Sequence, residues 1–341
     1  MAENEKTHPK FFDTMNDSIM NADIPEEEKS KLQRNLLHLR EQKINLMVTG
    51  ATGCGKSSTI NALFNTEKAK VGVGVDPETM EISRYELDNL ILWDTPGLGD
   101  GVAADERHAK NIIKKLRELD ENGNYLIDLV LVILDGSSRD LGTSYHLINN
   151  VIIPNLGEEK NSRLLVAINQ CDIAMKKRNV WNEEECRPTP ELEEFLEEKV
   201  ESVRRRIREG SGVDVTPIYY SAGYKEEGMP QSKPYNLSKL LYYIVAHTPE
   251  EKRLVLVDNI NKDKDTWAHS DGKSDYNADT ESEFAKTLEK YGTPFADAGD
   301  QIGSMFGDTG AEIGRTIGAG IGIAVGIGVS IVKAFNPFRW F

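Results

Sequence analysis

The sequence predicts an α/β protein with a doubly wound, mainly parallel sheet, a helical N-terminal segment and a glycine-rich C-terminal tail. Two observations predict the sheet. Apolar runs of strand length alternate with helix-length segments from Ile44 onward, and short polar motifs follow several of these runs. The run from Ile127 to Leu134 is apolar except for Asp128, which is typical of a strand buried on both faces. Ligand sites in such a fold lie at the carboxyl ends of the strands.

Composition divides the chain into four parts. Residues 1–43 are charged and helix-prone, and residues 44–258 carry the alternation of strands and helices. Residues 259–294 are rich in Asn, Asp, Lys, Ser and Thr, which indicates a polar linker. Residues 295–341 form an apolar, glycine-rich tail. The 341 residues are therefore expected to form one large domain with appendages.

The elements expected in the second part follow from the positions of its apolar residues. Strands are expected at 44–48, 81–87, 90–93, 127–134, 164–168 and 215–220, and helices at 58–64, 105–119, 141–153, 190–208 and 237–246. Asp88-Asn89 joins the second and third strands as a hairpin turn. In the N-terminal helical segment, an apolar stripe is expected from Leu32, Leu36, Leu37 and Leu39.

The charge and cysteine content limit the classes of function. The net charge of -15 argues against sequence-independent binding of nucleic acid, because neutralising phosphates needs clustered Lys and Arg. Cys54, Cys171 and Cys186 are an odd number without disulfide-like spacing, which indicates a reducing compartment. Residues 1–10 are polar and lack an apolar signal core. A cytoplasmic protein is expected, with membrane association left open by the C-terminal tail.

The segment from Gly50 to Ser57 fits the pattern G-x-x-x-x-G-K-[ST] between a predicted strand and a predicted helix. Its glycines allow successive backbone N–H groups to point into one concavity, and the following helix adds its positive end, which suits phosphate. Lys56 is expected to reach the β- and γ-phosphates, and Ser57 to ligate Mg²⁺. Both flanks disfavour a glycine-rich turn without a ligand. The expected nucleotide-binding residues are Gly50, Thr52, Gly53, Cys54, Gly55, Lys56, Ser57 and Ser58.

A second motif, Asp94-Thr95-Pro96-Gly97, follows the predicted strand at 90–93. In phosphate-loop NTPases, an Asp at this strand end holds Mg²⁺, usually through water, and a Gly three residues later can offer its N–H to the γ-phosphate. This short motif is common in general, but it is informative at a strand end after a phosphate loop. Asp94 is therefore a predicted metal ligand, and Gly97 a predicted contact to the γ-phosphate.

Two further loops indicate guanine. Asn169-Gln170-Cys171-Asp172 follows a predicted strand, and the Asp172 carboxylate can accept two hydrogen bonds from guanine N1 and N2, which would select GTP over ATP. Asn169 would tie this loop to the phosphate loop and approach the purine. Ser221-Ala222 follows the next strand and would place the Ala222 N–H near guanine O6. The expected ligands are GTP or GDP with Mg²⁺, and the expected base-site residues are Asn169, Gln170, Asp172, Ser221 and Ala222.

The four motifs resemble the G motifs of Ras-like GTPases, and the segment from Gly55 to Phe64 looks like the branch that contains Era and TrmE. Within that branch, residues Val73 to Thr79 before the hairpin and Asp94 to Asp100 after it resemble the bacterial YfjP/YeeP-like group. The resemblance covers residues 44 to 248. It implies a Ras-like G domain that hydrolyses GTP to GDP and phosphate.

The resemblance also implies a switch loop. Thr79 would close over Mg²⁺ and the γ-phosphate, the alternative being a capping or strand-edge threonine. Leu98 stands where Ras-like proteins carry a water-orienting Gln, so slow intrinsic hydrolysis is expected unless another group or protomer supplies that function. Catalysis is assigned to Lys56, Thr79 and Gly97, and the metal to Ser57, Thr79 and Asp94. Surface or capping roles are favoured over catalysis for Asp100, Asp105, His108 and Arg139.

Two positions depart from the family pattern. Gly53 stands where TrmE and Era relatives often carry an Asn linked to potassium-assisted catalysis, which puts potassium activation in doubt. Gln170 replaces the Lys of Asn-Lys-x-Asp, and its stem could still cover the base, so guanine specificity is expected. The phosphate loop is also similar to those of septin-like and immunity-related GTPases. Because those proteins pair across their nucleotide faces, the similarity implies a homodimer of that kind.

The tail carries a glycine repeat. Gly310, Gly314, Gly318, Gly322 and Gly326 recur every fourth residue, which puts them on one helix face where another helix can approach closely. No charge lies between Arg315 and Lys333, a stretch near the lower limit for spanning a bilayer. Membrane contact through residues 310–341 or helix self-association is favoured over a hairpin packed against the G domain.

The leading hypothesis is a Mg²⁺-dependent GTPase switch whose nucleotide state controls the linker and the tail. One alternative is a ribosome- or RNA-associated GTPase, which the acidic balance and the absence of an evident Gly-x-x-Gly RNA module disfavour. Another alternative is a membrane-acting effector that a G domain holds in check.

Overall fold

A computed structural model describes residues 10–22, 24–64, 70–72, 82–97, 101–223 and 232–290. The chain forms two compact units, one of residues 43–276 and one of residues 1–42 together with 277–341.

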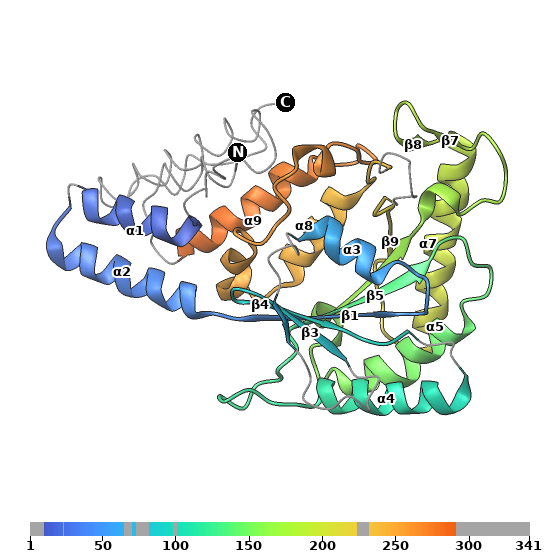
Figure 1. The fold of residues 1–341 in the computed structure, drawn as a ribbon, viewed down its shortest axis with the longest axis horizontal. Helices are drawn as coiled ribbons and strands as arrows, with labels where there is room; N and C mark the ends of the chain where they lie inside the picture. Colours follow the sequence, from blue (N-terminus) through green and yellow to red (C-terminus); the bar gives the residue numbers. More distant parts are fainter. Residues whose placement is uncertain are drawn as a thin grey trace, which may run out of the picture. The chain divides into compact units, whose positions relative to one another are not determined.

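The larger unit is built on a seven-stranded sheet in the order β2-β3-β4-β1-β5-β6-β9 (Figure 1). β1 pairs in parallel with β4 and β5, and β6 pairs in parallel with β5 and β9, whereas β2, β3 and β4 pair antiparallel. From β1 the chain fills one side of the sheet and then the other, so the prediction of a doubly wound, mainly parallel sheet is confirmed. The strands are β1 (Ile44–Gly50), β2 (Lys70–Gly72), β3 (Ser83–Leu87), β4 (Leu90–Asp94), β5 (Leu129–Asp135), β6 (Leu164–Asn169) and β9 (Ile218–Tyr219).

Helices cover both faces of this sheet. α4 and α5 lie on one face, and α3 and α8 lie on the other (Figure 1). Residues 129–134 of β5 are all buried because both faces are covered, which explains their continuous apolar run. The α-helices of this unit before residue 276 are α3 (Lys56–Leu63), α4 (Val102–Leu116), α5 (Gly142–His146), α6 (Lys160–Arg163), α7 (Pro190–Ser211) and α8 (Leu237–His247).

The predicted helix at 141–153 is not one regular α-helix. α5 continues into a π-helix, η2 (Leu147–Ile152), and then into a 3₁₀ turn, η3 (Ile153–Asn155). Pro154 has no N–H to donate to the preceding turn, so a regular α-helix cannot continue through this point. A small hairpin of β7 (Trp181–Asn182) and β8 (Arg187–Pro188) was not predicted either, because strands of two residues are too short to show alternation.

The region predicted as a polar linker contains packed structure. The compact unit continues past residue 258 to Tyr276. Trp267 is 2% exposed, and its Nε1 donates to Asn261 O at 3.0 Å. The few apolar residues here are widely spaced and show no helix or strand period, so composition alone indicated a linker. The short elements of the larger unit after β6 and α8 are η4 (Cys171–Ile173), η5 (Glu250–Leu256) and η6 (Lys264–Trp267). α9 (Tyr276–Lys290) begins at the last residue of this unit, and the rest of the helix belongs to the smaller unit.

The smaller unit contains α1 (Phe11–Asn21) and α2 (Glu26–Glu41). The two helices run antiparallel. Asp13 near the start of α1 pairs with Arg40 near the end of α2 at 3.0 Å, and Lys29 near the start of α2 donates to Met20 O near the end of α1 at 3.2 Å. Leu32, Leu36 and Leu39 are buried as predicted, but Leu37 is 55% exposed. The prediction for Leu37 was wrong because it lies about 100° around the helix from Leu36.

The predicted glycine-rich tail, residues 295–341, lies outside the described residues, as does residue 79 of the predicted switch loop. Among the helices that the structure describes, none is long and apolar enough to cross a membrane.

Asp128, the polar residue in the apolar run from Ile127 to Leu134, lies directly before β5, at the edge of the sheet where the parallel strands begin. Its carboxylate accepts the Asn45 N–H at 2.8 Å and pairs with Lys252 Nζ of η5 at 2.6 Å. Asp128 is 8% exposed, so this contact fastens the start of β1 and the segment after α8 to the same edge of the sheet.

Replacing Asp128 with Ala should lower the free energy of unfolding by roughly 2–4 kcal/mol, because a buried N–H and a largely buried ammonium lose their acceptor. Urea unfolding measures this loss. Glu198→Ala, on the exposed side of α7, is the control and should change the free energy by less than about 0.5 kcal/mol. Equal stability of the two variants would contradict this role of Asp128.

Candidate functional site: a nucleotide cradle at the carboxyl ends of the strands

The loop between β1 and α3 is shaped by its glycines. Gly55 has a φ of 89°, a left-handed conformation that favours glycine, and immediately precedes α3. A Cβ at this position would lie 2.2 Å from Asn169 Nδ2, so only a glycine lets the loop approach β6 this closely. Glycine at this position therefore sets both the turn into the helix and the contact with the guanine loop.

Lys56 lies over the inner side of the phosphate loop. Its Nζ donates to Gly50 O at 3.2 Å and to Ala51 O at 3.1 Å. Thr52, Gly53, Ser57 and Ser58 are exposed, so a ligand can reach them. These contacts hold the ammonium within the curl of the loop, where a phosphate would replace the carbonyl oxygens as its partner.

Cys54 differs from its neighbours because its side chain is fully buried. It is 0% exposed, and burial raises the pKa of its thiol to about 11. A Cβ at Gly50 would lie 2.8 Å from the Cys54 Sγ, which shows that the thiol fills the inside of the loop. The Cys54 side chain is therefore a small filler that a phosphate cannot reach.

Asp94 has the properties of a cation ligand. It ends β4, beside β1, and its Oδ1 is buried without a hydrogen-bond partner among the residues that the structure describes. Burial raises the pKa of Asp94 above its usual value, because its effect outweighs the opposing effect of the nearby Lys56 charge. An orphaned buried carboxylate oxygen, with the Ser57 hydroxyl at the start of the adjacent helix, fits a hard cation such as Mg²⁺. Thr79, the third predicted metal ligand, lies outside the described residues.

The loop after Asp94 is hydrogen-bonded to β1 and lies against the phosphate loop. Thr95 N donates to Val48 O at 3.1 Å, and Thr95 Oγ1 donates to Thr49 Oγ1 at 2.8 Å. A Cβ on Gly97 would lie 2.3 Å from Thr52 Oγ1 and 2.5 Å from Thr52 N. Gly97 therefore lies directly against the phosphate loop, as a residue that contacts the γ-phosphate must.

Asn169 joins three loops. Its Nδ2 donates to Cys54 O of the phosphate loop at 3.0 Å, and its Oδ1 accepts the Ala222 N–H at 3.0 Å. The sequence placed that N–H near guanine O6, whereas in the structure it donates to Asn169, because a buried N–H needs an acceptor. Ser221, the residue before Ala222, pairs with Tyr235 as an isolated bridge.

The other two predicted base-site residues of the guanine loop, Gln170 and Asp172, follow Asn169 in the chain. Gln170 has a φ of 60°, and its Nε2 donates to Gly53 O at 3.0 Å. Asp172 is partly exposed, and its carboxylate accepts no hydrogen bond from the part of the chain that the structure describes. A carboxylate without an internal partner is available to a base that offers two N–H donors.

Sequence reasoning missed two polar contacts around the site. Thr59 of α3 shares a buried 2.6 Å hydrogen bond with the hydroxyl of Tyr220. Lys199 of α7 donates to Ser138 O at 2.8 Å and to Gly136 O, which supports the loop after β5. Tyr220 could have been found by its place directly before Ser221, whereas Lys199 lies on a charge-rich helix where nothing distinguishes it from its neighbours.

The fold and the four loops define a GTPase domain of the phosphate-loop class. Residues 45–170 match the protein family described as 50S ribosome-binding GTPase. Two relatives come from Escherichia coli K12. YkfA is 31% identical over 157 residues, which are 45% of this chain and 50% of YkfA, and YfjP is 32% identical over 146 residues, which are 42% of this chain and 46% of YfjP.

A third similar protein is the mouse interferon-inducible GTPase 1. It is 38% identical over 76 residues, which are 20% of this chain and 18% of that protein. The chain spans about half the length of the two bacterial relatives. The similarity to YkfA and YfjP agrees with the bacterial YfjP-like group that the motifs indicated.

Replacing Asn169 with Ala should lower the free energy of unfolding by roughly 1–3 kcal/mol, because the buried Ala222 N–H loses its acceptor and Cys54 O loses its donor. Chemical denaturation measures the change. Asn150→Ala, an exposed asparagine of η2, is the matched control and should have a much smaller effect. A loss for Asn169 no larger than for Asn150 would mean that the loops hold together without this side chain.

Proposed function

We propose that this chain is a Mg²⁺-dependent GTPase that binds GTP, hydrolyses it slowly to GDP and phosphate, and acts as a nucleotide-controlled switch. The observation that carries the proposal is the convergence of four loops at the carboxyl ends of β1, β4, β6 and β9. Asn169 joins three of them, and Thr95 and Gly97 hold the loop after β4 against β1 and the phosphate loop. This is the edge at which a doubly wound sheet takes its ligand.

The residues of the site have separate tasks in this proposal. The backbone amides from Gly50 to Ser58 cradle the phosphates, and Lys56 neutralises the charge that develops during transfer. Ser57, Asp94 and Thr79 would hold Mg²⁺, which neutralises phosphate charge when bound. Gln170 covers the base, and Asp172 selects guanine, because adenine does not offer the two donors that guanine N1 and N2 provide.

The rate of hydrolysis follows from what is missing beside Gly97. Leu98 has no group that could orient a water molecule by hydrogen bonding. We therefore assign slow intrinsic turnover to the isolated protein. A second copy facing the nucleotide would be one source of the missing group, and a homodimer across the nucleotide face is part of the proposal.

Contacts at the far end of α3 support nucleotide control of the C-terminal segment. Asn261 N donates to Leu63 O at 2.9 Å, and Asn261 Nδ2 donates to Ala62 O at 3.0 Å. Phe64 and Ile260 form an isolated antiparallel bridge beside them. Because α3 begins with Lys56 of the phosphate loop, one rigid helix connects the phosphates with the chain that leads to the tail.

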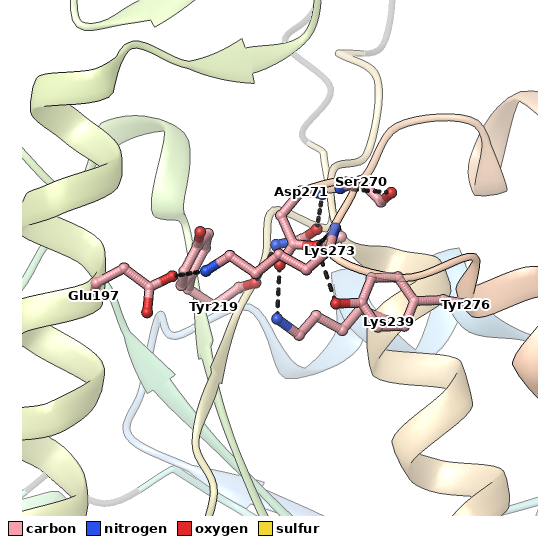
Figure 2. A network of polar contacts seen from close by, with 9 residues as sticks. Glu197, Tyr219, Lys239, Ser270, Asp271, Lys273 and Tyr276 are labelled. Carbon is pink, nitrogen blue, oxygen red and sulfur yellow. Dashed lines mark hydrogen bonds and ion pairs between the residues drawn. The ribbon is translucent and has the colours of Figure 1, made fainter. Parts of the chain in front are cut away.

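A second set of contacts ties the same segment to β9, the strand that leads into Ser221-Ala222. Asn236 donates to Tyr219 O at 3.1 Å and accepts the Asp271 N–H at 2.7 Å. The Asp271 carboxylate accepts from Lys239 at 2.7 Å and from the Tyr276 hydroxyl at 3.0 Å (Figure 2). Burial raises the Asp271 pKa, but these hydrogen bonds outweigh it, so the pKa lies below its usual value and the group stays charged at neutral pH.

The proposed target of the switch is the glycine-rich tail, which would contact a membrane or another copy of itself from a cytoplasmic protein. The glycine repeat and the uncharged stretch between Arg315 and Lys333 support this part of the proposal. A ribosome-associated role is the second candidate, because the matching family is described as ribosome-binding. Failure to co-sediment with ribosomal particles in either nucleotide state would remove it.

Replacing Asp172 with Ala should weaken Mg²⁺-GDP and Mg²⁺-GTP-analogue binding roughly 100-fold, because two charge-assisted hydrogen bonds to the base are lost. Isothermal titration calorimetry measures both affinities. Glu183→Ala, which removes an exposed carboxylate, should leave them unchanged. Wild-type protein that binds no guanine nucleotide in the presence of Mg²⁺ would refute the proposed function.

Full-length protein should co-sediment with anionic liposomes in one nucleotide state more than in the other, and a chain truncated after Pro294 should remain in the supernatant. Asp271→Asn, which weakens the pairing with Lys239, should reduce the difference between the GDP and GTP-analogue states without changing nucleotide affinity. Equal sedimentation of the full-length and truncated chains would contradict membrane contact through the tail.

A further inference from the structure

His108 contacts Gly97, which lies in the loop after β4. It belongs to α4, is 2% exposed, and places its Nδ1 3.3 Å from Gly97 O. The sequence suggested a surface or capping role for this residue, but the side chain is buried and reaches back to the loop before its own helix. Because a carbonyl oxygen can only accept, the contact makes Nδ1 the protonated nitrogen of the ring.

Gly97 is enclosed on two sides. Thr52 of the phosphate loop leaves no room for a side chain on one side, and His108 holds the carbonyl on the other. Glycine has the widest choice of backbone angles, so a glycine peptide keeps one orientation only where its surroundings fix it. The loop is also anchored at Thr95, whose N donates to Val48 O and whose Oγ1 donates to Thr49 Oγ1, so His108 adds a second anchor two residues further along.

From this arrangement we infer that His108 is a positioning residue for the γ-phosphate. It fixes the Gly97 carbonyl and so limits rotation about the Cα–C bond of Gly97, while Thr52 confines the residue on its other side. Together these contacts hold the Gly97 backbone in the conformation in which its N–H, on the Pro96 side, faces the terminal phosphate. The inference rests on the proposed function, since it assigns to His108 a preference for GTP over GDP. GDP has no γ-phosphate, so the orientation of Gly97 affects GTP binding alone.

The position of His108 has a second consequence for α4. The same hydrogen bond connects Gly97 with the middle of a helix whose Ile112 and Leu116 are fully buried in the core. A Gly97 carbonyl that turns must carry His108 with it or break this hydrogen bond. The hydrogen bond therefore couples the position of α4 to the orientation of the Gly97 carbonyl.

The test compares His108→Leu with His108→Asn. Leu fills the space without a donor, whereas the Asn amide nitrogen occupies nearly the place of Nδ1 and can donate to Gly97 O. His108→Leu should weaken the Mg²⁺-dependent affinity for a slowly hydrolysed GTP analogue about fivefold, the factor expected from one net hydrogen bond, and should leave the GDP affinity within twofold of wild type. His108→Asn should restore most of the analogue affinity.

Ile112→Val is the matched control, because it loosens the packing of α4 one turn further on without reaching Gly97. It should leave both affinities unchanged. Thermal melts of all variants show how much each one loses in stability, so that packing and positioning can be separated.

Equal losses for GDP and the analogue in His108→Leu, or no recovery in His108→Asn, would overturn the positioning role and leave a packing residue. If His108→Leu does not fold, His108→Gln takes its place, because its longer amide cannot donate from the Nδ1 position. Analogue affinity equal to that of His108→Asn would then overturn the inference. Wild-type protein without guanine-nucleotide binding would refute the proposed function itself, whereas normal wild-type binding with unchanged variants would refute the inference alone.

Discussion

The candidate site depends on one buried amide group, that of Asn169. Its nitrogen binds the phosphate loop and its oxygen binds the loop after β9, while its backbone oxygen accepts the Gly136 N–H at 2.8 Å. The side chain of Asn169, which is 3% exposed, therefore joins the phosphate loop to the loop after β9, and its backbone oxygen adds the loop after β5. A buried amide that loses a partner is costly, so these loops keep their relative positions even though each lies at the surface.

The sheet supports this arrangement because its strands fix the points from which the loops begin. β5 is buried on both faces, and the parallel pairing of β1 with β4 and β5 brings their carboxyl ends to one edge. Polar contacts then act on loops whose starting points are fixed. The amino ends need a fastening of their own, which Asp128 provides through Asn45 and Lys252.

The sequence predicted what depends on local pattern. The phosphate loop, the Asp94 strand end and the guanine loop could be recognised because each follows an apolar run, and because glycine, lysine and carboxylate have specific chemistry at those positions. The strands expected at 44–48, 90–93 and 164–168 agree with β1, β4 and β6 within two residues at each end. Site roles that rest on a bound nucleotide, such as those of Asp172 and Ser57, stay predictions.

Features that depend on contacts between distant residues could not be predicted. His108 has no neighbouring motif, and only the path of α4 brings it to Gly97. The π-helix at 147–152 reflects tertiary packing and a nearby proline rather than a period in the sequence. Leu37 was counted in the buried stripe because the angle around the helix between Leu36 and Leu37 was not taken into account. Trp267 could not be recognised as a core residue because it stands alone in a polar segment.

The contact between Asn261 and the end of α3 bears on where the domain ends. The family match stops at residue 170, before β9 has joined the sheet, and the last recognisable motif is at Ala222. Yet the carbonyl oxygens of Ala62 and Leu63 find their donors on Asn261, almost two hundred residues later. A boundary drawn after the last motif would therefore remove the donors at the end of α3, whereas the compact unit, which runs to Tyr276, includes them.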